Sequence, residues 1–278
     1  MLLMLLCGAL LVAGVVIALL WGGEPLVEPR PSSDAARPRL AALGTYARWC
    51  ALLTLAGTAS GILIVGAGGR LAMRLLASTS PSATGRSTEG LAVVGDITIE
   101  GTLAFVAFGA LPLAFVAAAA YLLAAPWLPR GRLAGPALGV VLLVTGSPFV
   151  DPLRADNRDF DLLGPGWLAV AVFAMLALLQ GMAVAAICGR VSRALASDSE
   201  RARGGTAAAL VPAVVLVPVG VVLALGALVV AALPRALPSV LAARSAPRGI
   251  LLGRVLLAVA VLAAAPAFIG AVVSISTR

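Results

Sequence analysis

Apolar residues gather in seven windows along the chain, each near the length that a helix needs to cross a lipid bilayer. A hydrocarbon core of about 30 Å takes roughly 20 helical residues. The pattern predicts an all-α fold, a polytopic transmembrane helix bundle of about seven spans that forms one integral membrane domain over residues 1–278. Six or eight spans remain open, because the fourth window is short and contains Pro148. The windows are Leu2–Trp21, Trp49–Ala67, Thr102–Ala125, Leu133–Val150, Leu163–Cys188, Ala207–Leu233 and Ile250–Ser274.

The tryptophans provide a second indication of where the spans end. All four lie at window ends, where an amphipathic ring favours the headgroup region: Trp21, Trp49, Trp127 and Trp167. The first window lacks a positively charged start and an A-x-A cleavage site, so we expect a retained helix rather than a signal peptide. Pro112, Pro218 and Pro266 lie inside windows and predict kinks.

Most joints between the windows are short, but the segment 68–100 is longer. Gly85, Gly90 and Gly95 interrupt it, and Val93–Glu100 alternates between apolar and polar residues. A joint of this length in a compact protein predicts a folded extramembrane cap over the bundle, between the second and third spans.

Small residues recur at helical spacing inside several windows. Helices in lipid associate through close packing of such residues. The sequence therefore predicts helix contacts at Gly57 and Gly61, at Gly135 and Gly139, and at Gly181 and Ala185.

Composition strengthens the membrane assignment and excludes several kinds of chemistry. The chain is 61% hydrophobic and 12% charged, against about 25% charged in soluble domains. It contains no His, and all 20 of its Lys+Arg residues are Arg. Schiff-base chemistry on Lys, Ser-His-Asp catalysis, H-E-x-x-H zinc sites and His-ligated haem are therefore excluded. Cys7, Cys50 and Cys188 form no metal-binding spacing, and we expect no cofactor and no metal.

The formal net charge of +8 resides in arginines of the joints. There it suits anionic lipid headgroups and not nucleic acid. With seven spans, the arginines divide 11 to 9 between the two sides. This small margin favours a plasma-membrane protein with its N-terminus out and its C-terminus in. Arg without Lys, together with abundant Ala, Gly and Val, indicates GC-rich coding and a bacterial source.

Acidic residues cluster in the second and fourth joints, which face the same compartment. We expect a candidate polar-face site there, composed of Asp96, Glu100, Asp151, Asp156, Asp159, Asp161, Arg70, Arg74, Arg154 and Arg158. Asp156 and Asp159 form a D-x-x-D pair that could hold Mg²⁺ at a diphosphate. A solvated network of salt bridges is the competing interpretation, and for Arg70 and Arg74 the simplest role is contact with lipid headgroups.

Three functions remain open. The first is a structural, accessory or regulatory membrane protein, with a homo-oligomer or another membrane protein as partner. The second is a channel or facilitator for a small or lipidic solute, with a path past the mid-span residues Thr54, Thr58, Ser60 and Gln180. The third is a lipid-processing enzyme that uses an acidic metal site. No window carries Asp or Glu near its centre, which argues against a proton-coupled carrier. We expect Gln180 to form a hydrogen bond with a neighbouring helix.

Overall fold

The structure is a computed structural model that describes residues 1–28, 38–89, 92–147, 149–150, 153–196 and 200–278, and most of these residues are helical. Helices account for 80% of the chain and the described residues contain no strand, only an isolated bridge between Ser87 and Val93. The prediction of an all-α fold is confirmed. Pro148 and Asp151 lie outside the described residues.

Five continuous helical segments are long and apolar enough to cross a membrane. A sixth is counted if the bent pair α10 (Val217–Ala232) and α11 (Ala236–Ser245) forms one span. The predicted count of about seven is therefore not confirmed. The five segments are α1 (Leu2–Leu20), α2–η1–α3 (Pro38–Thr79), α4–η3–α5 (Ile99–Ala124), α7 (Gly166–Ala194) and α12 (Pro247–Ser276).

Two predicted windows do not form a full span. The window Leu133–Val150 yields only η4 (Gly131–Leu133) and α6 (Ala134–Gly146), which is shorter than a typical crossing. The window Ala207–Leu233 is divided among α8 (Glu200–Ala209), α9 (Val211–Val215) and α10. Pro212 and Pro218 stand in the first turns of α9 and α10. Proline lacks an N–H and clashes with the preceding turn, so the apolar run breaks there.

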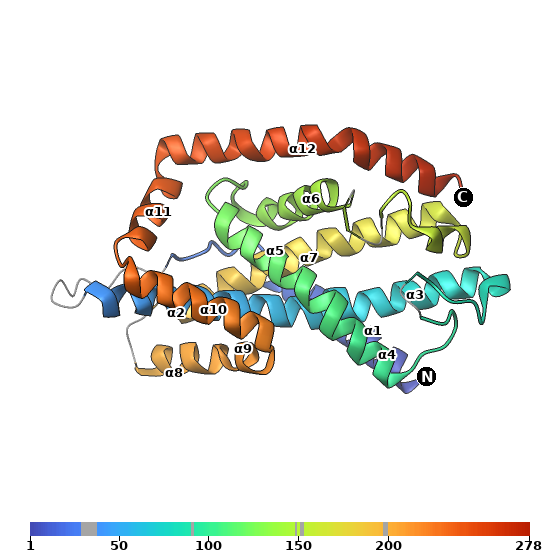
Figure 1. Cartoon of the computed structure of the whole chain (residues 1–278), viewed down its shortest axis with the longest axis horizontal. Helices are drawn as coiled ribbons and strands as arrows, with labels where there is room; N and C mark the ends of the chain where they lie inside the picture. The colour runs from blue at the N-terminus through green and yellow to red at the C-terminus, as the bar shows by residue number, and fades with distance from the viewer. Residues whose placement is uncertain (29–37, 90–91, 148, 151–152, 197–199) are drawn as a thin grey trace.

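The broken segment folds back on itself. In Figure 1, α8 and α9 lie beside α10, next to α2. The chain then bends by 98° between α10 and α11, and α12 follows. Thr54 of α2 donates to the carbonyl of Ala209, the last residue of α8, over 2.5 Å. Tyr46 of the same helix donates to the carbonyl of Leu223 in α10 over 2.9 Å. The α8–α10 segment is thus a helical hairpin held by α2.

The second segment is much longer than its apolar window, Trp49–Ala67. It runs for 42 residues, about 63 Å at 1.5 Å per residue. α3 (Ala67–Thr79) continues the helix into the segment 68–100 that the sequence predicted as a cap, and the described residues between Ser80 and Thr98 form a loop that includes η2 (Pro81–Ala83). Two π-helical turns, η1 (Gly61–Gly66) and η3 (Phe105–Ala110), lie against each other where the second and third segments meet.

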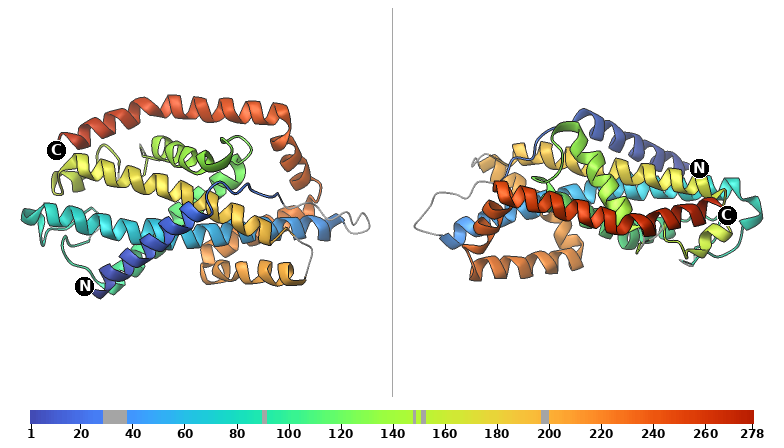
Figure 2. Two further views of the ribbon diagram at one scale, coloured as in Figure 1. Left: turned by 180° about the vertical axis from the view of Figure 1, so that it is seen from behind. Right: turned by 90° about the horizontal axis from the view of Figure 1, so that it is seen from above.

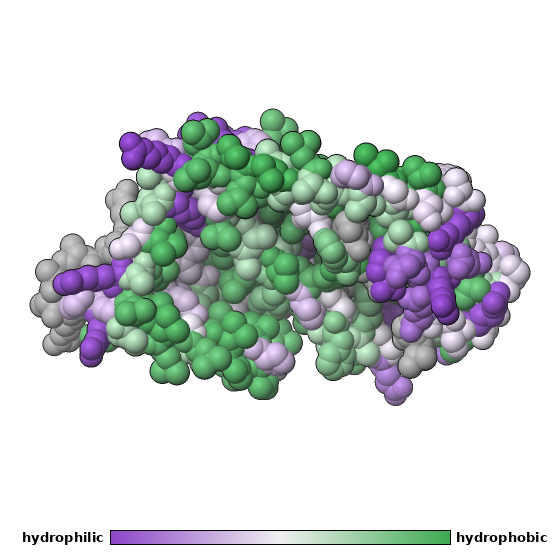
Figure 3. Space-filling model, turned by 45° about the horizontal axis from the view of Figure 1, so that its top comes forward, coloured by the Kyte–Doolittle hydropathy of each residue, from purple (hydrophilic) through white to green (hydrophobic). Residues whose placement is uncertain are grey.

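Polar residues gather at the two ends of the long axis. Figure 3 shows hydrophilic side chains toward both ends and a broad hydrophobic band between them on the face drawn. We call one the arginine-rich end, formed by residues 21–28, 125–133, 190–196 and 233–248. The other is the acidic end, formed by loops 80–98 and 153–165 with the C-terminus. The hydrophobic band is the part that a bilayer would cover.

Both chain termini lie at the acidic end (Figures 1 and 2). Contacts fix this arrangement, because Arg278 pairs with Asp161 at the acidic end while Arg244 pairs with Glu28 at the opposite end. The sequence predicted an N-terminus out and a C-terminus in; both termini lie at one end of the bundle, and the compartment that this end faces stays a prediction. Two features of the chain account for this arrangement: α6, although short, leads from the arginine-rich end toward the loop 153–165 of the acidic end, and the hairpin α8–α10 returns to the end from which it starts.

Glycines permit two close helix contacts. A Cβ atom at Gly139 would lie 2.7 Å from the Ala177 carbonyl oxygen, and one at Gly135 would lie 2.6 Å from Met182 Cα. Gly181 faces both of these glycines from α7. On α2, Gly57 lies against the Phe115 ring, while Gly61, the first residue of η1, lies against Leu111 and Ala114. The glycines predicted to form helix contacts thus lie between α6 and α7 and between the second and third segments.

We expect Gly139→Ala to lower the stability of the protein by about 1–3 kcal/mol, because the added methyl group collides with the backbone of α7. Gly146→Ala is the matched control in the same helix, since nothing lies within 4 Å of its added Cβ. Thermal unfolding in detergent measures both variants. Equal midpoints for the two would contradict the close contact between α6 and α7.

Candidate functional site

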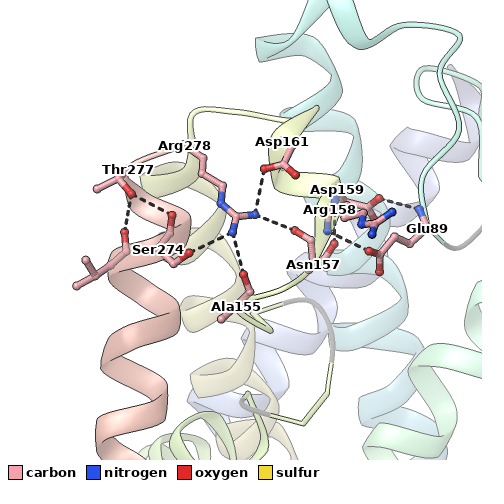
Figure 4. Close-up of polar contacts among 10 residues, drawn as sticks. Glu89, Ala155, Asn157, Arg158, Asp159, Asp161, Ser274, Thr277 and Arg278 are labelled. Atoms are coloured by element: carbon pink, nitrogen blue, oxygen red, sulfur yellow. Dashed lines mark hydrogen bonds and ion pairs between the residues drawn. The ribbon is translucent and has the colours of Figure 1, made fainter.

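Glu89 joins the two loops of the acidic end. Its carboxylate accepts a hydrogen bond from Arg154 Nη2 over 2.8 Å and from the Arg158 backbone N–H over 3.1 Å. Its own N–H donates to Asp159 Oδ1 over 2.8 Å. Figure 4 shows the contacts of Glu89 with Arg158 and Asp159 beside η5 (Arg158–Asp161). Loops about 70 residues apart in sequence are therefore held together through one residue.

Arg278 ties the end of α12 to the same loop. One guanidinium nitrogen donates to Asp161 Oδ1 over 3.1 Å and to the Asn157 carbonyl over 3.3 Å. The other donates to the Ala155 carbonyl over 2.9 Å and to Ser274 Oγ over 3.1 Å. In Figure 4 the side chain extends from α12 across the loop that precedes α7. We call this set of contacts, centred on Glu89 and Arg278, the acidic-end clamp.

The end of α3 is fastened to the same region. Thr79 and Ser80 both donate to the Gly164 carbonyl, over 2.6 and 2.9 Å. The Gly164 N–H in turn donates to Ser80 Oγ over 2.8 Å. The loop 153–165 is thus anchored to the end of α3, to the end of α12 and to the loop that contains Glu89.

The structure gathers only some of the residues predicted to form the polar-face site. Arg154, Arg158, Asp159 and Asp161 take part in the clamp, and Asp156 pairs with Arg154 over 2.9 Å. Asp151 lies outside the described residues.

The remaining members of the predicted site lie apart from the clamp. Asp96, Glu100 and Arg74 are exposed. Arg70 instead donates to Thr102 Oγ1 over 3.0 Å and lies over the Phe105 ring at 5.7 Å. It therefore packs α3 against the third segment.

The clamp is a set of ion pairs rather than a cluster of free carboxylates. Arg154 and Glu89 are about one third exposed, and such pairs contribute little individually. Among the described residues, no three Asp, Glu or Cys side chains gather as a metal ion would require. The arrangement suits the joining of loops.

The arginine-rich end contains ionic contacts that the sequence did not indicate. Arg244, with only 5% of its side chain exposed, pairs with Glu28 over 2.6 Å. It also donates to the carbonyls of Leu122 and Leu123 at the end of α5 and lies 5.1 Å from the Trp49 ring. Trp49 is consequently buried inside α2 and does not mark its start.

The segment after α1 is fixed against the end of α7. Glu24 pairs with Arg193 and, over 3.7 Å, with Arg190. The Glu24 backbone lies so close to Gly189 that a Cβ atom there would collide with it. The Val27 N–H donates to Ser192 Oγ over 3.0 Å.

A small cavity opens beside this segment. It has a volume of about 50 Å³ and lies between the end of α1, the start of the helix at 131–146 and α7. Ala185, predicted as a packing residue, lines it together with Tyr121. The other lining residues are Ala18, Leu19, Gly22, Gly23, Glu24, Gly131, Arg132, Ala134, Gly135 and Met182.

Polar side chains within the hydrophobic band bond across helices. Gln180 Nε2 donates to Ser60 Oγ over 2.8 Å, and both residues are buried. The prediction that Gln180 bonds a neighbouring helix is confirmed. Thr54 instead bonds Ala209 of α8. Thr58 Oγ1 and Gln180 Oε1 are buried without a hydrogen-bond partner among the described residues.

Sequence reasoning missed Glu89, Arg278, Glu24, Glu28 and Arg244. Their partners lie from 65 to more than 200 residues away, so no local spacing reveals them. One local signal was present at Glu89, which lies between Gly85 and Gly95. Both glycines have φ values near +80° to +90° and turn the loop back on itself.

Comparisons with protein-family models, with curated proteins and with solved structures found no match for this chain.

We expect Glu89→Ala to destabilise the protein by about 1–2 kcal/mol, because it removes the acceptor for Arg154 and for the Arg158 N–H. Asp96→Ala removes an exposed carboxylate outside the clamp and should change stability by less than about 0.5 kcal/mol. Thermal unfolding in detergent at low and high salt compares them. A Glu89 variant no less stable than the Asp96 variant would show that the clamp does not hold the loops.

Proposed function

We propose that this chain is a multi-pass membrane protein with a structural, accessory or regulatory role rather than an enzyme. The observation that carries the proposal is that carboxylates at both ends of the bundle form ion pairs with arginines. Glu24, Glu28, Glu89 and Asp161 each face an arginine. Groups engaged in this way are suited to fixing loops and helix ends, whereas catalytic groups must remain available to a substrate.

The distribution of arginines supports a plasma-membrane orientation. Of the arginines whose side chains are described, ten lie toward the arginine-rich end and six toward the acidic end. Positively charged residues are retained on the cytoplasmic side, so the arginine-rich end faces the cytoplasm and both termini face outward. The ten are Arg39, Arg48, Arg130, Arg132, Arg190, Arg193, Arg235, Arg244, Arg248 and Arg254; the six are Arg70, Arg74, Arg86, Arg154, Arg158 and Arg278.

Labelling of single cysteines in intact bacterial cells with a membrane-impermeant maleimide tests this orientation. Arg86→Cys and Thr277→Cys should react from outside, and Arg130→Cys only after permeabilisation. The native cysteines are buried and supply a low background. Reversal of all three results would overturn the orientation alone. Labelling of Arg86→Cys and Thr277→Cys from different sides would overturn the shared location of the acidic loop and the C-terminus.

One face of the bundle, along α12, exposes apolar side chains that lipid or a partner would cover. The most apolar window of α12 is only 6% buried inside the protein, although the helix contacts α6 and α7. Leu251, Leu256 and Leu262 are among its exposed side chains. Lipid chains or a helix of a second membrane protein, including another copy of this chain, would cover this face.

A facilitator for a lipidic solute is the second candidate, and the helical hairpin α8–α10 favours it. Broken helices that end within a membrane expose backbone groups at that depth, a recurrent feature of transport proteins. The end of α8 lies against Thr54 of α2, inside the hydrophobic band. Thr54 and Ser60, however, face different neighbours, α8 and α7, and so do not line one shared path.

Reconstitution into liposomes separates the two candidates. For an accessory protein we expect no flux of ions or small solutes and no transfer of fluorescent phospholipid between leaflets above protein-free vesicles. Lipid transfer that falls in Thr54→Val, which loses the bond to Ala209, would replace the first proposal with the second. Ser78→Ala, at an exposed position on α3, is the control.

A further inference from the structure

The cavity at the arginine-rich end has one polar and one apolar wall. Glu24, Gly131 and Arg132 supply polar groups, whereas Leu19, Met182 and Ala185 supply an apolar wall. The apolar residues belong to α1 and α7, which continue from there into the hydrophobic band. A ligand in this cavity would have its polar part toward the end of the bundle and any apolar part along these two helices.

The charges around the cavity favour an anion. The Glu24 carboxylate already faces both Arg190 and Arg193. Arg132 is exposed and has no hydrogen-bond or ion-pair partner among the described residues. These four side chains together leave two uncompensated positive charges.

The start of the helix at 131–146 adds donors to the same wall. η4 and α6 are continuous, and the preceding residue, Arg130, makes no side-chain cap. Gly131, with φ +69°, and Arg132 are the first residues of this helix and both line the cavity, whereas the N–H of Ala134 already bonds the Gly131 carbonyl. The first N–H groups of a helix lack partners within it and attract negative charge, which reinforces Arg132.

Size and depth indicate which part of a ligand fits. A volume of about 50 Å³ is several times the roughly 10–15 Å³ that holds one water, and it suits a compact group of a few atoms. Trp21 caps α1 and Trp127 follows α5, the level at which indole rings meet headgroups. The cavity therefore lies where lipid phosphates lie.

We infer that this cavity binds the phosphate of an anionic phospholipid, with Arg132 and the first N–H groups of the helix at 131–146 as donors and the acyl chains along Leu19 and Met182. A lipid is favoured over free phosphate because its acyl chains can pack against the apolar lining residues, whereas a free anion makes no favourable contact with them. The inference rests on the proposed placement of the arginine-rich end at the membrane surface.

Binding of short-chain phosphatidylglycerol to the purified full chain in neutral detergent tests the inference. Its affinity, read from the rise of the unfolding midpoint with lipid concentration, should fall about tenfold in Arg132→Gln. Arg132→Lys keeps the charge and should retain part of the affinity. Arg235→Gln removes one exposed charge from the same end, away from the cavity, and should behave as the wild type.

Each other outcome overturns the inference in a distinct way. Equal losses in Arg132→Gln and Arg235→Gln would indicate diffuse attraction to the whole end. Equal stabilisation by phosphatidylcholine would show no preference for an anionic lipid, and equal stabilisation by inorganic phosphate would identify a free anion. Cysteine labelling reports separately on the membrane orientation, so failure of the cavity and failure of the proposed placement are distinguishable.

Discussion

A backbone carbonyl inside hydrocarbon has no water to bond, and this constraint determines how the central part of the bundle is arranged. The constraint applies where α8 ends at Ala209, because the last carbonyls of a helix lack partners within it. Thr54 supplies a donor there, and Tyr46 supplies another to Leu223. Both belong to the same helix, α2, which also packs against α5 and α7. The broken hairpin is therefore tolerable only because α2 lies beside it.

The two ends of the bundle use arginine differently. At the acidic end, Arg154 and Arg278 bind carboxylates and carbonyls of nearby loops while staying partly in solvent. At the arginine-rich end, Arg244 is almost wholly buried and satisfies Glu28 together with two carbonyls of α5. A buried arginine that loses its partner is costly. The arginines of the acidic end hold surface loops together, whereas the buried Arg244 fixes the position of α11 against α5.

Hydropathy predicts the membrane class and the positions of most helices, because apolar length is a local property of the sequence. Hydropathy predicts one span over Ala207–Leu233, because an average over the window takes no account of the helix breaks at Pro212 and Pro218. It also ends the second span at Ala67, although the helix continues to Thr79 and Arg70 within it bonds Thr102 of the third segment. The loop 153–165, in which the sequence placed residues of the candidate site, is the loop that the acidic-end clamp holds. The central residues of the clamp were missed because Glu89 and Arg278 acquire their partners only through tertiary contacts.

The burial of Arg244 has a consequence for synthesis. Glu28, Trp49 and the Leu122 carbonyl all precede it in the chain, the last by 122 residues. At about 5–20 residues per second, a ribosome needs roughly 6 to 25 s to make that stretch. Throughout this interval the nascent protein holds Glu28 near the lipid boundary without its arginine. The last third of the chain thus completes an ionic contact whose other members lie in its first half, and it does so before α12 is made.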